Sequence, residues 1–358
     1  MKRILVTGAG GSACYNFIES LRDNNSGEKF YIVGTDVSRY HIELSNVDKR
    51  YIVPRVTEPR YFDVVNTIIE REKIDFLHCQ PDIEVEVLSR EKDRIHTRTL
   101  LPRPETVEIC QDKMRFNTIL RKNNLPVPEA YHITSENDLE KAMEALLRTN
   151  EKVWLRAIHG AGSRGAIPVK KLEHARMWID YWHTMKDLSY GDFMVSEFLP
   201  GKEYAFQSVW RDGELLMSQA RERVEYIFGN LTVSGQSSSP SVAVTVQNDE
   251  INATVSSVVK TIDPHATGIF CADLKTNKEG RIVLIEINAG RFFTTSFFFS
   301  SAGCNMPYYY TKIGLGENVV IPTQPFDNIP ADWYWVRMID MGYKLIKPGE
   351  WTSEDLSK

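Results

Sequence analysis

Strand and helix patterns alternate along the first hundred residues, and this alternation limits the possible folds more than any other feature. Three short apolar runs are typical of buried strands: Lys2–Thr7, Phe30–Asp36 and Phe76–Gln80. Three amphipathic patterns predict helices between and after them: Ala13–Arg22, Tyr61–Glu72 and Glu84–Ile95. Strands that alternate with helices form parallel sheets, so this part is predicted to be an α/β domain. Pro102 and Pro104 mark its end.

The remaining chain has the pattern of antiparallel strands with helices, an α+β arrangement. A helix is predicted over Asp112–Asn123, and Ser135 with Asp138 resembles the start of a second helix over Leu139–Leu147. Asp212-Gly213 is a strong signal for a tight hairpin. The predicted strands are Val153–Ala157, Phe193–Phe198, Tyr204–Trp210, Glu214–Arg223, Gly268–Thr276 and Arg281–Asn288.

Composition excludes several classes of protein. The 358 residues are 42% hydrophobic and 25% charged, which is typical of a globular protein with more than one domain. A formal net charge of -5 predicts no nucleic-acid partner. No apolar run approaches the ~20 residues of a membrane span, so no membrane partner is expected. The five cysteines are odd in number, scattered and without a CxxC pair, which favours reduced thiols in the cytoplasm over disulfides or zinc.

A glycine-rich segment joins the first strand to the first helix. Gly8–Ala13 fits the G-x-G-x-x-A form of the dinucleotide fingerprint, and Asp36 ends the second strand near the position of a ribose-binding acid. This pattern leaves NAD binding open. The plainer interpretation is that the glycines permit a tight turn between strand and helix.

Four later segments together suggest a site for a nucleotide phosphate. Asp112–Phe116 begins a helix, and Trp154–Gly165 carries a cation on a strand that enters a glycine-rich loop. Such a loop can turn backbone N–H groups toward phosphate oxygens, although a flexible hairpin would have the same composition. The other segments are Val195–Tyr204 and the pair Cys271–Leu274 and Leu284–Arg291.

The last pair of segments carries candidate metal ligands. Glu286 and Asn288 are two residues apart on a strand and therefore face the same way, and Asp273 on the preceding strand can face them. Three oxygen ligands on a rigid sheet suit Mg²⁺, which takes its other oxygens from nucleotide phosphates and water. A solvated strand face is the alternative for Glu286, but the apolar run Ile282–Ile287 disfavours it.

In combination, these segments resemble the ATP-grasp superfamily over about residues 2–315, and within it the carbamoyl-phosphate-synthase-like ligases. Gln80–Glu84 is similar to the P-T-x-D-x-E segment of that family. The resemblance implies a Rossmann-like pre-ATP-grasp domain at 1–105, followed by a two-subdomain ATP-grasp fold. Its N-terminal subdomain would span 106–192 and its C-terminal subdomain 193–320, with an extension at 321–358.

The resemblance also implies roles for individual residues. Catalytic roles fall to Arg156 and Arg291, although Arg291 lies one residue later than in the common Glu-x-Asn-Pro-Arg ending, which leaves its role open. The implied Mg²⁺ ligands are Asp273, Glu286 and Asn288. The residues implied to bind ATP are Lys113, Arg156, Gly160, Gly162, Ser163, Gly165, Glu197, Leu199 and Glu203.

The expected activity is therefore that of an ATP- and Mg²⁺-dependent ligase. It would activate a small carboxylate, such as an amino acid, as an acyl phosphate and couple it to an amine, with release of ADP and phosphate. Candidate substrate residues are Asp82, Glu84, Arg221 and Arg223. Arginine suits bidentate contacts with a carboxylate, but Arg221 and Arg223 could instead form surface ion pairs near Glu222 and Glu225.

Three other functions remain open at this stage. The first is different ATP-grasp chemistry, such as carboxyphosphate formation or a small-molecule kinase. The second is an NAD(P)-dependent Rossmann oxidoreductase that uses Gly8–Ala13. The third is a non-catalytic nucleotide-binding module, which the set Asp273, Glu286 and Asn288 disfavours. The expected partners are small-molecule substrates, and a homodimer is left open.

Overall fold

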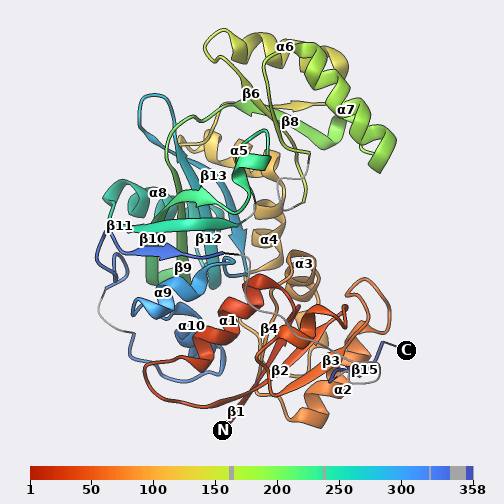
Figure 1. Cartoon of the computed structure of the whole chain (residues 1–358), viewed down its shortest axis with the longest axis vertical. Coiled ribbons are helices and arrows are strands. Elements are labelled where there is room, and N and C mark those ends of the chain that lie inside the picture. Colours follow the sequence, from red (N-terminus) through yellow and green to blue (C-terminus); the bar gives the residue numbers. More distant parts are fainter. Residues whose placement is uncertain (161–164, 236, 238, 322–323, 339–351, 358) are drawn as a thin grey trace.

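The computed structural model describes residues 1–160, 165–235, 237, 239–321, 324–338 and 352–357. The described residues form three β-sheets, which we call sheets A, B and C. Sheet A lies at one end of the long axis, sheet B at the other, and sheet C between them (Figure 1). None of the helices in these ranges is both long and apolar enough to cross a membrane.

Sheet A is the parallel sheet that the alternating pattern predicts. Its strand order is β15-β3-β2-β1-β4. The first two strands match their predicted ranges, whereas β4 ends two residues early at His78. Its strands are β1 (Lys2–Thr7), β2 (Phe30–Asp36), β3 (Lys49–Ile52), β4 (Phe76–His78) and β15 (Glu354–Asp355).

Four helices accompany sheet A. The predicted helix Glu84–Ile95 begins earlier, at Asp82 directly after Pro81, and ends at Arg90. Acidic residues in its first turn suit the positive end of the helix dipole, which favours the earlier start. The helices are α1 (Ser12–Arg22), α2 (Tyr61–Glu72), α3 (Asp82–Arg90) and α4 (Pro104–Gln111).

Sheet B is antiparallel, with the order β5-β8-β6-β7, and α6 and α7 pack on one face. Alternate residues of β6 are buried, so Arg156 projects from the face opposite these helices. The Ser135 side chain caps α6 by accepting a hydrogen bond from Asp138 N at 3.2 Å, which confirms the predicted helix start. The elements are α5 (Lys113–Lys122), β5 (Ala130–Ile133), α6 (Glu136–Leu147), β6 (Val153–Ala157), β7 (Ile167–Val169), α7 (Leu172–Lys186) and β8 (Phe193–Glu197).

Sheet C is antiparallel, with the order β13-β12-β9-β10-β11-β14. The predicted hairpin at Asp212-Gly213 is confirmed, because both residues adopt the positive φ of a tight hairpin turn between β9 and β10. The elements are β9 (Glu203–Arg211), β10 (Glu214–Tyr226), β11 (Pro240–Val246), α8 (Asp249–Ile262), β12 (Gly268–Thr276), β13 (Ile282–Ala289), α9 (Ser296–Ser301), α10 (Met306–Gly314) and β14 (Tyr334–Val336).

The two faces of sheet C are buried differently. Helix α8 covers one face. The other face shares a hydrophobic core with α9, α10 and helix α1 of the N-terminal region, where the Phe17 and Phe292 rings lie 5.8 Å apart. This shared core fixes the start of α1 beside sheet C. The described parts of the predicted extension add β14 to sheet C and β15 to sheet A.

Candidate functional site

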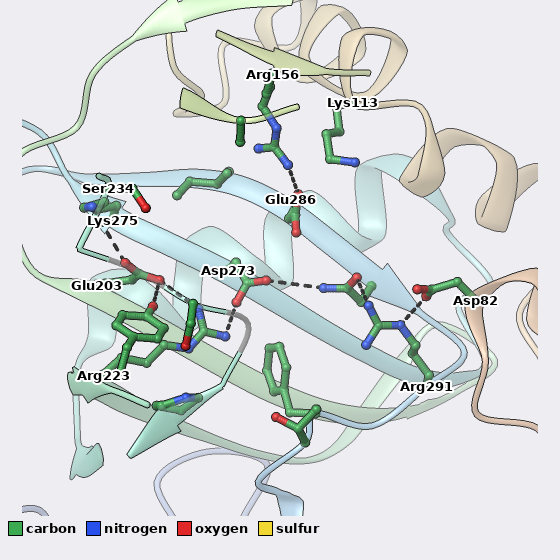
Figure 2. Close-up of a pocket in the computed structure, with 18 of the residues that line it drawn as sticks. Asp82, Lys113, Arg156, Glu203, Arg223, Ser234, Asp273, Lys275, Glu286 and Arg291 are labelled. Carbon is green, nitrogen blue, oxygen red and sulfur yellow. Dashed lines mark hydrogen bonds and ion pairs between the residues drawn. The ribbon is translucent and has the colours of Figure 1, made fainter. Parts of the chain in front are cut away.

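One cavity of about 480 Å³ is lined by residues from sheets B and C and from the segments that follow the strands of sheet A. The structure brings most of the predicted site residues to its wall (Figure 2). Gly162 and Ser163 lie outside the described residues, and Glu84, Gly160 and Gly165 are not among those that line the cavity. The predicted residues on the wall are Asp82, Lys113, Arg156, Glu197, Leu199, Glu203, Arg221, Arg223, Asp273, Glu286, Asn288 and Arg291.

The acidic set on β12 and β13 has the predicted arrangement. Asp273 and Glu286 are paired across the two antiparallel strands, so their side chains share one face of sheet C. Asn288 is two residues further along and donates a hydrogen bond to Asp273 Oδ2 at 3.3 Å. The juxtaposition is confirmed, while the metal-binding role stays a prediction.

Arg156 joins sheet B to this acidic set. Its Nη2 donates to Glu286 Oε2 at 2.6 Å across the cavity (Figure 2). Burial alone would raise the pKa of Glu286, but the Arg156 and Lys113 cations outweigh it and lower that pKa to about 2. The carboxylate is therefore ionised at neutral pH and held toward the strand that enters the glycine-rich loop.

Lys113 lies where that strand ends. Asp112 caps α5 by accepting a hydrogen bond from Arg115 N at 2.8 Å, which sets Lys113 at the first position of the helix. The Lys113 Nζ donates to Ile158 O at 3.2 Å and to Gly160 O at 2.9 Å. Burial lowers the pKa of this amine, and the nearby Glu286 works against that effect. A half-buried ammonium thus lies beside the start of the predicted phosphate loop.

Arg223 connects the acidic set with Glu203. It donates to Asp273 Oδ1 at 2.5 Å and to Glu203 Oε1 at 3.0 Å (Figure 2). Tyr226 also donates to Glu203, and Lys275 Nζ lies 3.7 Å from it. The alternative of a surface ion pair for Arg223 is therefore wrong, because this arginine is bound to two acids inside the cavity. Its own acid contacts also leave its predicted substrate role without direct support.

Arg221 is likewise not a surface residue. Only 1% of it is exposed, and its Nη1 donates to Thr295 O at 3.1 Å. Its Cζ lies 5.3 Å from the Phe293 ring and 5.0 Å from the Phe299 ring. The surface ion pair considered for this residue is wrong as well, since its side chain is enclosed by sheet C and the segment after β13.

The shifted arginine after β13 reaches a partner in the N-terminal region. Gly290 has a φ of +87°, and a Cβ there would meet Val85 at 2.5 Å. Glycine can adopt this backbone conformation, which accommodates the one residue more than in the common Glu-x-Asn-Pro-Arg ending. Arg291 then donates to Asn288 Oδ1 at 2.6 Å and to the Asp82 carboxylate. Asp82 thereby lines the cavity from the start of α3 (Figure 2).

Glu84 lies away from the cavity wall. Its side chain is buried in the sheet A region, with Oε2 lacking a hydrogen-bond partner among the described residues. Burial raises its pKa to about 7. Although it follows Asp82 by two residues, it lies on a different face of α3. The structure therefore does not support a direct contact between Glu84 and a substrate in the cavity.

Glu197 and Leu199 line the cavity where β8 ends. The Glu197 carboxylate accepts a hydrogen bond from Glu129 N at 3.0 Å, and Glu197 N donates to Glu129 O at 2.9 Å. These bonds tie the end of β8 to the chain before β5. The backbone between Glu197 and Leu199 is thereby held at the cavity edge, where the resemblance implies an adenine contact.

The sequence prediction missed the apolar part of the lining. Trp154, Met194, Phe198 and Ile285 also line the cavity. Strand alternation carries a signal for two of them: Trp154 shares a face with Arg156, and Met194 pairs with Arg156 across β6 and β8. Apolar walls beside a few polar groups are typical of small-molecule sites.

The glycine-rich turn before α1 has a structural function of its own. A Cβ on Gly10 would meet Ile42 N at 2.7 Å. Asp36 accepts hydrogen bonds from Gly10 N at 2.9 Å and from Ser38 N at 2.8 Å. Asp36, the acid expected to bind a ribose in an NAD site, is therefore engaged by backbone N–H groups of the glycine-rich turn and of its own loop. Gly8, Gly11, Ser12, Ala13 and Cys14 from this segment line the cavity.

Comparison with known proteins finds two family models that match this chain. A family model described as the PylC-like N-terminal domain matches residues 4–100, and one for the ATP-grasp domain matches residues 110–295. A similar solved structure is an L-amino acid ligase from Bacillus licheniformis, with a TM-score of 0.66 at 14% identity, covering 88% of this chain and 74% of that chain.

Two further structures share the fold. One is the biotin carboxylase domain of the Hydrogenobacter thermophilus 2-oxoglutarate carboxylase, in complex with MgADP, ADP and bicarbonate; its TM-score is 0.68 at 15% identity, covering 93% of this chain and 73% of that chain. The other is the N5-carboxyaminoimidazole ribonucleotide synthetase from Thermotoga maritima, with a TM-score of 0.59 at 20% identity, covering 89% and 77%. The family match over 110–295 spans more than half of the chain, and the protein therefore belongs to the ATP-grasp family.

Proposed function

We propose that this protein is an Mg-ATP-dependent ligase that phosphorylates a small carboxylate and couples the resulting acyl phosphate to an amine, releasing ADP and phosphate. One observation carries the proposal. The cations Lys113 and Arg156 of the sheet B region face the acids Asp273 and Glu286 of sheet C across a cavity of about 480 Å³. Phosphoryl transfer requires such positioned opposite charges more than covalent chemistry from the protein.

The residues that would hold Mg²⁺ are Asp273, Glu286 and Asn288. Their oxygens suit this ion. Burial raises the pKa of Asp273 even though Arg223 pairs with it, and the neighbouring Glu286 raises it further. Two acids that repel each other in a buried site are a fit for a divalent cation. When bound, Mg²⁺ would supply neutralisation of the charge on the phosphates of ATP.

The chain's own groups have separate tasks in this proposal. Lys113 and Arg156 would orient the β- and γ-phosphates, since both lie at the exit of β6. Glu203 would accept hydrogen bonds from the ribose hydroxyls. The adenine would lie between the apolar side chains Trp154 and Met194, with its edge read by the backbone of Glu197 and Leu199. Arg291 would face the carboxylate that receives the phosphoryl group.

The names of two similar structures point to different substrates of those proteins, an amino acid in one and bicarbonate in the other. The amino acid ligase and the two carboxylation-related enzymes share this fold at 14–20% identity, which supports ATP-grasp chemistry and leaves the reaction open. Carboxyphosphate formation would be identified by a requirement for bicarbonate. The NAD(P) alternative is disfavoured, because Asp36 is engaged in its own turn.

The test is a thermal midpoint and turnover experiment. We expect Mg-ATP to raise the midpoint and NAD(P) to leave it unchanged. ADP release is then measured against a panel of amino acids and other carboxylates, with and without bicarbonate, and with mass detection of products. Stabilisation by NAD(P) without an effect of Mg-ATP would disprove the proposal, and AMP formed in step with product would exclude the acyl phosphate.

A further inference from the structure

Arg221 is a buried cation on the cavity wall, and no carboxylate in the described part of the chain pairs with it. It is 1% exposed and lines the cavity. The described residues provide Thr295 O as a hydrogen-bond acceptor at 3.1 Å, but no carboxylate pairs with Arg221, and its Nε has no hydrogen-bond partner. A buried charge is costly unless it is paired, so this guanidinium calls for an anion from outside the chain.

The pairing of the other cavity cations makes Arg221 stand apart. Among the described residues of the wall, four cations have carboxylate partners: Arg156, Arg223, Lys275 and Arg291. Lys113 and Arg221 form no ion pair with a described carboxylate. Lys113 lies beside the predicted phosphate loop and is assigned to ATP above. Among the described cations of the wall, Arg221 is then the one without a carboxylate partner that remains for a substrate.

Helix α1 and Arg221 line the same cavity and are connected through residues 295–297. Thr295 O accepts the Arg221 hydrogen bond, and two residues later Phe297 N donates to Asn16 Oδ1 at 3.1 Å. Asn16 in turn donates to Ser12 O at 2.9 Å, in the first turn of α1. This helix has 11 residues, no side-chain cap and no acid in its first turn. Its N-terminal residues on the cavity wall are Ser12, Ala13 and Cys14.

A bare helix N-terminus and a buried guanidinium favour the same kind of ligand. The free N–H groups and the dipole of α1 attract negative charge. The Arg221 Nε is enclosed and has no hydrogen-bond acceptor among the described residues, so the guanidinium is left without a partner on the side that Thr295 does not occupy. Arginine binds planar carboxylates and phosphates with two parallel hydrogen bonds.

We propose that Arg221 and the first turn of α1 bind an anionic group, a carboxylate or a phosphate, which the substrate keeps throughout the reaction. The proposal rests on the proposed function, because it assigns one anion to ATP activation and a second to recognition. The reacting carboxylate has to reach Arg291 and the ATP phosphates. The anion at Arg221 is a second group that does not react and serves in recognition. The enzyme would therefore select a substrate with two anionic groups or an amine that carries one.

The experiment uses the whole protein and two anions, succinate and inorganic phosphate. Thermal midpoints are measured against increasing anion at matched ionic strength, with chloride as the reference, both with and without Mg-ATP in its non-hydrolysable imido form. The variants are Arg221→Met and Arg221→Lys. The matched control is Arg337→Met, a half-buried arginine that donates to Pro240 O at 2.9 Å and Thr294 O at 3.1 Å but is not among the residues of the cavity wall.

We expect a saturable midpoint increase by one anion in the parent and in Arg337→Met. Arg221→Met should lose at least ~10-fold in apparent affinity, since a hydrogen-bonded charge is removed. Arg221→Lys should retain part of the effect. Without an anion, the Arg221→Met midpoint should equal or exceed that of the parent, because no ion pair is lost. A response to succinate identifies a carboxylate, and a response to phosphate identifies a phosphate group.

Several results would overturn the inference. One is a parent that responds to neither anion beyond chloride, and another is an Arg221→Met variant that responds like the parent. A third is a large loss of the thermal midpoint in Arg221→Met while every variant, Arg221→Lys included, keeps the anion effect. That result would assign Arg221 a structural role only. Failure of the imido nucleotide to raise any midpoint would reject the proposed function, while the anion series without nucleotide still judges Arg221.

Discussion

Replacing Glu286 by Gln separates the stability of the site from its chemistry. The change keeps the volume and removes the charge that Arg156 binds at 2.6 Å. The side chains of Arg156 and Glu286 are 15% and 25% exposed, so the pair is mostly shielded from water. Loss of the carboxylate leaves Arg156 without its acid and should destabilise the fold.

The magnitude follows from the pKa of Glu286. The Arg156 and Lys113 cations hold it at about 2, below its ordinary value of 4.5, in spite of burial. At about 1.4 kcal/mol per pH unit, the difference bounds the stabilisation at about 3 kcal/mol. Removing Glu286 also relieves its repulsion of Asp273. We therefore expect a loss of about 1–3 kcal/mol, or about 1–2 °C in the midpoint for each kcal/mol in a chain of 358 residues.

The sign of the pH dependence gives a second measurement. A carboxylate with a lowered folded pKa stabilises the protein above its unfolded pKa, and this stabilisation is lost as the pH falls from about 4.5 toward 2. The difference between parent and Glu286→Gln should therefore be full at pH 7 and shrink below pH 4.5. Urea midpoints at pH 7, 5 and 4 measure it.

Turnover should respond far more than stability. ADP release by Glu286→Gln should fall by about 10²–10³, as it does when one electrostatic contact to a developing charge is removed. The control is Glu279→Gln on the exposed turn between β12 and β13, where the side chain is 45% exposed. Near-parent turnover of Glu286→Gln at limiting Mg²⁺, together with an unchanged midpoint, would refute the reasoning about this site.

Three further changes test separate parts of the structure. Lys113→Met should weaken Mg-ATP binding at least ~10-fold in calorimetry, because the ammonium beside Gly160 is lost, and an unchanged affinity would remove Lys113 from the ATP site. Burial raises the Glu84 pKa to about 7, so the stability of the parent should decline between about pH 4.5 and 7, where Glu84 ionises in the unfolded chain before it does in the folded one. Glu84→Gln should remove this decline in urea midpoints, and a decline that persists in the variant would contradict the prediction. Ser135→Ala should cost about 1 kcal/mol by loss of the α6 cap, with ADP release unchanged.

The fold was largely predictable because its signals are local. Hydrophobic periodicity places β1, β2, α2, β6 and β12 at their observed ranges. Among the described elements, the missed strands are β3, β5, β7, β11, β14 and β15, and the missed α-helices are α4, α7, α8, α9 and α10. In sheet A, β3 (Lys49–Ile52) begins with two basic residues and β15 has only two residues, so neither has a periodic signal. Both join sheet A by backbone pairing, which depends on the assembled sheet rather than on their own composition.

The location of the site was also predictable, but its contacts were not. The face shared by Glu286 and Asn288 follows from strand geometry, and Asp273 follows from the hairpin. In contrast, the Arg156–Glu286 pair joins residues 130 positions apart, and Arg291 reaches Asp82 across 209 positions. Such pairs depend on how the sheets dock, and no local pattern contains that information.

Arg221 and Arg223 show where sequence reasoning fails most sharply. They are two residues apart on β10, so they share a face, and the sequence suggests the same role for both. Register separates them: Arg223 lies opposite Glu203 on β9, whereas Arg221 lies opposite Ala205 on β9 and Thr245 on β11. One arginine consequently binds two acids, and the other has an oxyanion site to fill. In our proposal, Arg221, which no described carboxylate pairs, is therefore a better indicator of the charge on the substrate than the ion-pair network around Arg223.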